Sequence, residues 1–123
     1  MPESVFNEGT INGTDFRIES DTNVNMFFVD GGNNRIGIGT ASPGSLLEVK
    51  GTGETQIYIN SASGNNSGVR FLENGTNKWT IGHDESDDKL FFYEFITNST
   101  RMVIESDGKV GIGETAPLAT LHV

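Results

Sequence analysis

The chain has 123 residues, which suits a single domain, and it carries 16 glycines but no cysteine. Without cysteine the fold has neither disulfides nor a thiolate zinc site. A formal net charge of −9 disfavours nucleic acid and anionic membrane surfaces as partners. No apolar run approaches the ~20 residues of a membrane-spanning helix, and the N-terminus lacks the basic and apolar regions of a signal peptide. We expect a chain that needs no cofactor, binds no nucleic acid and does not insert into a membrane.

The first part of the chain is predicted to form short strands joined by polar turns. Residues 1–12 are polar and are expected to form an N-terminal arm that serves for attachment. Residues 13–20 alternate, which places Phe16 and Ile18 on one face of a strand. A turn at 21–23 leads to a second strand over 24–30, and the glycines and asparagines of 31–34 predict the next turn.

A repeated segment is the most informative feature of the sequence. Residues 35–49 align without a gap to residues 109–123, an offset of 74 residues from Arg35 to Lys109. Both copies contain Gly-Ile-Gly, a proline four residues later and a final Leu-x-Val. Stacked repeats usually need about three copies to be stable alone, and only two are present. We therefore expect the missing burial to come from other copies of the same chain.

The segment between the two copies is predicted to hold several more strands. Gln56 to Asn60 alternates as a strand does, and Asn74-Gly75 is a strong hairpin signal between strands at 68–73 and 78–82. Strands over 89–96 and 101–105 form the next predicted pair. Because no helical crossover is predicted, antiparallel hairpins and meanders are expected. The predicted fold is all-β, with an arm at 1–12, a first β-repeat at 13–50, a central β-module at 51–98 and a second β-repeat at 99–123.

The alternating glycines of the repeat predict a close approach to another backbone. They leave one face of a strand without side chains, while the intervening isoleucines face the other way. We expect the close approach to be between chains. The alternative is a strand edge at which no other backbone approaches the glycines. The prolines at 43 and 117 then end the strand ladders. The predicted interface between chains comprises Ile36, Gly37, Ile38, Gly39, Leu47, Val49, Val110, Gly111, Ile112, Gly113, Leu121 and Val123.

The sequence resembles the fibre proteins of bacteriophages. The motif is carried by Asn34 to Pro43 with Leu47 to Val49, and by Gly108 to Pro117 with Leu121 to Val123. The segment from Val69 to Gly82 resembles the module that lies between such motifs. The resemblance implies an elongated, intertwined, β-rich homotrimer on the surface of a virion, in a tail or capsid fibre, that attaches to the host.

The resemblance also implies the partners of the chain. These are two further copies of itself, other virion proteins that residues 1–12 could contact, and a host-surface glycan. The predicted function is that of a non-enzymatic virion structural protein. The alternatives are a capsid decoration protein of similar fold and, less favoured, a tailspike that cleaves glycans.

The acidic residues do not form a recognised catalytic or metal-binding motif. His83 to Asp88 is the densest polar segment, but it lacks the glycine and the final glutamate of an EF-hand loop, which favours a solvated turn. Carboxylate pairs can cleave glycosides, and with 17 acidic residues some pair will always look suitable. The candidates are Glu73, Asp84, Asp87, Asp88 and Glu94. We expect no metal site and no enzymatic activity.

Aromatic residues are concentrated in the central region. Most of them, the phenylalanines above all, are expected to fill the core of the central module. Trp79 and Tyr93 are the candidates for contact with a glycan, because tryptophan and tyrosine are common anchors at binding sites.

Overall fold

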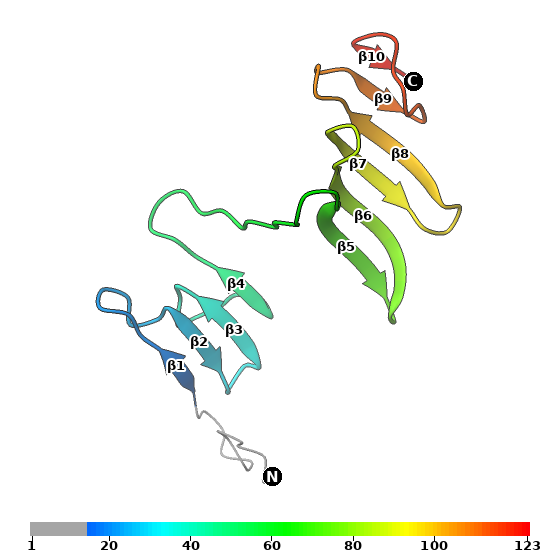
Figure 1. The fold of residues 1–123 in the computed structure, drawn as a ribbon. Coiled ribbons are helices and arrows are strands. Elements are labelled where there is room, and N and C mark those ends of the chain that lie inside the picture. The colour runs from blue at the N-terminus through cyan, green and yellow to red at the C-terminus, as the bar shows by residue number, and fades with distance from the viewer. Residues whose placement is uncertain (1–14) are drawn as a thin grey trace. The chain divides into compact units, whose positions relative to one another are not determined.

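The computed structural model describes residues 15–123, in two compact units that meet in sequence at Ile57 and Tyr58. The predicted arm at 1–12 lies outside the described residues. Each unit contains one β-sheet, and the described residues include no helix that could cross a membrane (Figure 1). The all-β prediction is confirmed.

The first sheet has four short strands in the order β1-β2-β3-β4. They are β1 (Phe16–Ile18), β2 (Phe27–Asp30), β3 (Arg35–Ile38) and β4 (Leu47–Val49). The turn between β2 and β3 is the predicted one, and Asp30 stabilises it by accepting hydrogen bonds from the backbone and side-chain amides of Asn33. β1 and β2 begin later in the chain than predicted.

The second sheet has six strands in the order β10-β9-β8-β7-β6-β5. They are β5 (Ser67–Glu73), β6 (Thr76–Asp84), β7 (Lys89–Glu94), β8 (Ser99–Ile104), β9 (Val110–Ile112) and β10 (Leu121–His122). The predicted Asn74-Gly75 hairpin is present between β5 and β6, and φ is positive at both residues, as the favoured two-residue hairpin turns require. The predicted central module and second repeat are joined in this one sheet.

Two strand pairs correct the expectation of purely antiparallel sheets. β3 pairs with β4 and β9 pairs with β10 in parallel, so both sheets are mixed. Parallel neighbours usually need a crossover of about a dozen residues or more. Here the short loops 39–46 and 113–120 suffice because each returns tightly beside its own strand. The amide of Ile36 donates to the carbonyl of Leu46 at 2.8 Å, and that of Val110 to Thr120 at 3.0 Å.

The predicted strand at Gln56 to Asn60 is wrong for the single chain. These residues lie outside both sheets, in the connection between the two units, and Ile57 is 70% exposed. An alternating sequence forms a strand only where a neighbouring edge accepts its backbone hydrogen bonds. The pattern alone does not supply that edge.

The hydrophobic core of each unit is small. Among the described residues the buried hydrophobic side chains are Phe28 and Val103, together with the buried prolines of the two loops. Phe28 is the register partner of Gly37, and Val103 is the register partner of Gly111. The interior therefore lies between the glycine-bearing face of each sheet and its own loop.

Candidate functional site

The first sheet has a face that is entirely apolar. Directly opposed residues on neighbouring strands lie on the same face of a sheet. The register therefore aligns Phe16, Val29, Ile36 and Leu47 in one row across the four strands. The next row on this face holds Ile18 and Phe27 at one end, and the opposed pair Ile38 and Val49 at the other.

This apolar face is open in the single chain. Ile18 is 50% exposed and Leu47 is 59% exposed. A sheet with one apolar face is stable only when another layer covers that face. The four apolar residues predicted for the interface in this copy (Ile36, Ile38, Leu47 and Val49) all belong to it.

The second sheet repeats the arrangement with a longer row. Val69, Ile81, Phe92, Met102 and Ile112 are aligned across β5 to β9. The neighbouring row on the same face is apolar from Leu90 through Ile104 and Val110 to Leu121, and polar at its other end, at His83 and Ser67. Leu121 is 59% exposed, as its counterpart Leu47 is, and Val123 is exposed at the chain end. Of the predicted apolar residues of the second copy, Val110, Ile112 and Leu121 thus share one face, and Val123 lies beyond β10.

The glycines of the repeat meet the backbone of their own chain. A Cβ atom on Gly37 would lie 2.1 Å from the carbonyl oxygen of Thr40, and one on Gly111 would lie 2.1 Å from that of Glu114. A Cβ atom on Gly39 would lie 2.1 Å from the carbonyl of Lys50, whereas at Gly113 the space is open and φ is +74°. The close approach that the sequence predicts between chains is therefore satisfied by the loop or the following strand end of the same chain at three positions. A place for these glycines at an interface remains a prediction.

The opposite face of the second sheet carries a groove of about 620 Å³, within the size range of ligand sites. One row that lines it is Arg70, Thr80, Tyr93 and Thr100, aligned across β5 to β8. The adjacent row contributes Gly68, Phe91 and Val103. Phe95 lies just beyond β7 and completes the lining at one end.

The two residues predicted to contact a glycan lie on opposite faces. Tyr93 lines the groove, and its ring meets that of Phe95 edge-to-face at 4.9 Å. Trp79 precedes Thr80 on β6, so its side chain points to the apolar face, where it is 41% exposed. One sugar cannot contact both. Arg70, Thr80 and Phe95 are groove residues that the sequence did not single out.

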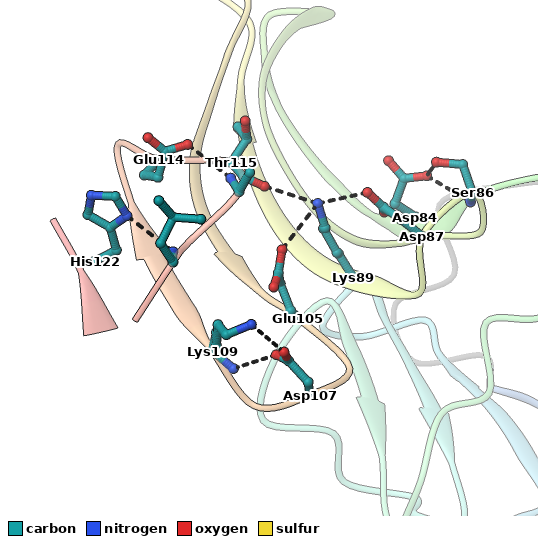
Figure 2. A network of polar contacts seen from close by, with 12 residues as sticks. Asp84, Ser86, Asp87, Lys89, Glu105, Asp107, Lys109, Glu114, Thr115 and His122 are labelled. Atoms are coloured by element: carbon teal, nitrogen blue, oxygen red, sulfur yellow. Dashed lines mark hydrogen bonds and ion pairs between the residues drawn. The ribbon is translucent and has the colours of Figure 1, made fainter. Parts of the chain in front are cut away.

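Lys89 closes the other end of the groove in a network of polar contacts. Its ammonium group lies 2.8 Å from Asp87, 3.5 Å from Glu105 and 3.0 Å from the carbonyl of Thr115 (Figure 2). The hydrogen bond to Asp87 is the main reason why the pKa of Lys89 is raised, with Glu105 adding to it. Lys89 thereby ties the β6–β7 turn to the loop that precedes β10.

The acidic segment from His83 to Asp88 forms the turn between β6 and β7. Asp84 accepts hydrogen bonds from the hydroxyl and amide of Ser86, which lower its pKa, and His83 lies 3.2 Å from Asp88. Within residues 15–123 no group of three or more His, Cys, Asp or Glu side chains could hold a metal ion. Asp84 and Asp88 have their partners, Ser86 and His83, within the same turn and strand end.

Glu94 is the acid whose pKa is shifted most strongly. It is 6% exposed and accepts hydrogen bonds from the hydroxyl of Thr97 and from the guanidinium of Arg101. These contacts, with the Thr97 hydroxyl first, lower its pKa to about 2. A glycosidase acid needs a raised pKa, so the environment of Glu94 suits an anchor for the β7–β8 turn rather than a proton donor.

No model of a known protein family matches this chain, and no curated protein matches it.

Proposed function

We propose that the chain is a non-enzymatic module of a trimeric virion fibre or spike that takes part in attachment to the host surface. The observation that carries the proposal is the unpartnered apolar face of each sheet. The first copy of the motif has Ile36, Ile38, Leu47 and Val49 on such a face, and the second copy has Val110, Ile112 and Leu121. The resemblance to bacteriophage fibre proteins supplies the trimeric state and the location on a virion.

A small buried core is the physical reason for assembly. Short chains bury a smaller fraction of their surface and often depend on oligomerisation for stability. In a closed cyclic oligomer every subunit covers the same patch, so one sequence can cover its own apolar faces. The interface of the proposed trimer consists of Ile36, Ile38, Leu47 and Val49 with Val110, Ile112, Leu121 and Val123.

The segment around Ile57 fits an intertwined assembly. Its alternating pattern is that of a strand, yet it lies outside both sheets of its own chain. Pairing with an edge strand of another copy would place this segment in a sheet. Hydrogen exchange of residues 54–60 in the assembled protein tests this point, since slow exchange is expected and rapid exchange would contradict the pairing.

Attachment is tested with the purified assembly. Wild-type protein is expected to bind host cells and to reduce adsorption of the virus that carries this sequence. A matched variant that stays monomeric, Leu47→Asp with Leu121→Asp, should lose most of both effects. Equal activity of the monomeric variant would contradict a role for the trimer, and absence of binding by wild type would contradict attachment.

Two experiments separate this function from its alternatives. Antibody labelling of particles in the electron microscope should mark fibres; labelling spread over the capsid would favour a decoration protein. Release of reducing ends from host polysaccharide would favour a tailspike that cleaves glycans.

A further inference from the structure

The lining of the groove on the second sheet includes a glycine, Gly68. Gly68 and Gly82 are register partners on adjacent strands. A Cβ atom on Gly68 would lie 2.6 Å from the carbonyl of Ile81, and one on Gly82 would lie 2.6 Å from that of Ser67. The strands approach too closely here for any other residue. The ring of Phe91 lies next to Gly82, where a Cβ atom would be 3.0 Å from the ring, so this ring forms part of the floor.

One end of the groove presents a guanidinium group and aromatic rings together. Arg70 lies over the ring of Phe95 at 5.0 Å from its centroid, and its Nε donates a long hydrogen bond of 3.4 Å to Thr80. Arginine has five N–H donors in a planar fork that matches a carboxylate. The ion pairs formed by residues 15–123 do not include Arg70. Its charge is therefore available to a ligand.

The charges at the other end are already paired. Lys89 is 19% exposed at its side chain and is held between Asp87 and Glu105 (Figure 2). Asp84 is occupied by Ser86. The groove thus has one available cation, although the whole chain carries a net charge of −9. A local positive site in an acidic protein selects its ligand by short-range pairing rather than by long-range attraction.

We propose that this groove binds a saccharide that bears a carboxylate. The carboxylate pairs with the fork of Arg70, the apolar face of the sugar ring packs on Tyr93, and the hydroxyl of Thr100 meets a hydroxyl of the sugar. The groove lies on the face opposite the predicted interface of this sheet, so covering the apolar face leaves it accessible. This inference depends on the proposed attachment function and names its ligand class.

Titration calorimetry with the wild-type assembly tests the proposal, with hexagalacturonate and sialyllactose as acidic probes. Carboxyl-reduced hexagalacturonate is the neutral control, and inorganic phosphate is the alternative anion. At least one acidic probe is expected to bind, and the neutral control and phosphate are expected to bind at least about tenfold more weakly. Absence of binding by both acidic probes, equal binding of the neutral control, or tighter binding of phosphate would overturn the proposal.

Variants locate the site. Arg70→Gln should weaken binding of the acidic probe by about tenfold or more, and Arg70→Lys should weaken it less, because the charge remains but the fork is lost. Tyr93→Leu should also weaken binding. Arg17→Gln is the matched control, since Arg17 belongs to the first sheet and pairs with Glu19. Unchanged affinity in Arg70→Gln, or an equal loss in Arg17→Gln, would overturn the assignment.

The native mass and circular dichroism of each variant show that it has assembled and folded. If Arg70→Gln stays trimeric and still blocks adsorption as well as wild type does, the groove assignment fails while the attachment function stands. If wild-type protein does not assemble or attach, the proposed function itself fails.

Discussion

The two copies of the repeated motif share a backbone design but differ in the charges that hold their loops. In both, the third residue of the motif is a glycine under a carbonyl of its own loop. In both, a side chain early in the loop accepts a hydrogen bond from the amide two residues on, Thr40 from Ser42 and Glu114 from Ala116. The repeat therefore encodes a local unit of strand, loop and parallel strand.

The differences lie where the loop meets the rest of its unit. Arg35 donates to the carbonyl of Pro43 in its own loop at 2.8 Å. Its counterpart Lys109 instead pairs with Asp107 at 2.6 Å, and Lys89 from β7 holds the second loop. The motif needs a cation near its loop, but that cation need not come from the motif. Substitutions at matching positions of the two copies test this account.

The largest effect is expected at the covered glycines. Gly37→Val and Gly111→Val would force a side chain into a backbone carbonyl, so each should destabilise its own unit by at least about 2 kcal/mol. Denaturant unfolding followed by circular dichroism measures the loss. Gly44→Leu is the matched control, because the second copy carries Leu118 at that position and Gly44 has only a contact of 3.6 Å with Glu48. A loss of stability in Gly44→Leu as large as that in Gly37→Val would contradict the close approach of the Thr40 carbonyl to Gly37.

The next largest effect concerns assembly. Leu47→Asp and Leu121→Asp place a charge at equivalent, equally exposed positions of the two apolar faces. In a trimer that buries them, each should raise the concentration at which the assembly dissociates by at least about tenfold, because a buried unpaired charge is costly. Sedimentation velocity over a dilution series measures this. Leu118→Asp, in the exposed loop of the second copy, should leave dissociation unchanged; loss of assembly there would remove the special role of the faces.

Substitution of the fifth residue of the motif should destabilise the two copies by different amounts. Both Gly39 and Gly113 have positive φ, which costs an alanine about 1 kcal/mol. Only Gly39 also faces a carbonyl, that of Lys50. In denaturant melts Gly39→Ala should therefore lose more stability than Gly113→Ala. Equal losses would show that φ alone governs both sites.

A smaller effect is expected from acid, and it should fall mainly on the second unit. Glu94 has a pKa of about 2 in the folded chain against an ordinary 4.5, so its stabilising contribution is present above pH 4.5 and is lost as the pH falls towards 2. The depressed pKa values of Asp84, Asp107 and Glu114 in the second unit act in the same direction, and among the described residues of the first unit that of Asp30 does so too. Melting at pH 7 and pH 3 should show a smaller fall in Tm for Glu94→Gln than for wild type. Equal falls would contradict the role of Glu94.

The sequence predicted most of the strands but not which face each residue of the groove occupies. Glycine-rich turns and alternation are local signals, and the Asn74-Gly75 hairpin formed as expected. Next to that turn Leu72 pairs with Asn77, and an uninterrupted ladder would pair Arg70 with Trp79. A bulge beyond Leu72 instead pairs Arg70 with Thr80. A slip of one residue exchanges the two faces of a strand, so Trp79 and the groove row could not be assigned from the pattern.

The parallel pairs were missed for a related reason. Proline and glycine in the repeat predicted a turn but not its path, and a loop of this length normally joins antiparallel strands. The amides of residues 36 and 110 donate the hydrogen bonds that hold each loop beside its own strand. Every strand has such amides, so the sequence does not reveal which of them will bind a loop carbonyl. The apolar face was predicted better, because it depends only on alternation.

The native mass of the wild-type protein at micromolar concentration tests the central claim most directly. Assembly through the apolar faces predicts a particle of three times the 13.3 kDa chain mass. A stable monomer of 13.3 kDa would contradict the trimer and the interface assigned to both copies of the motif.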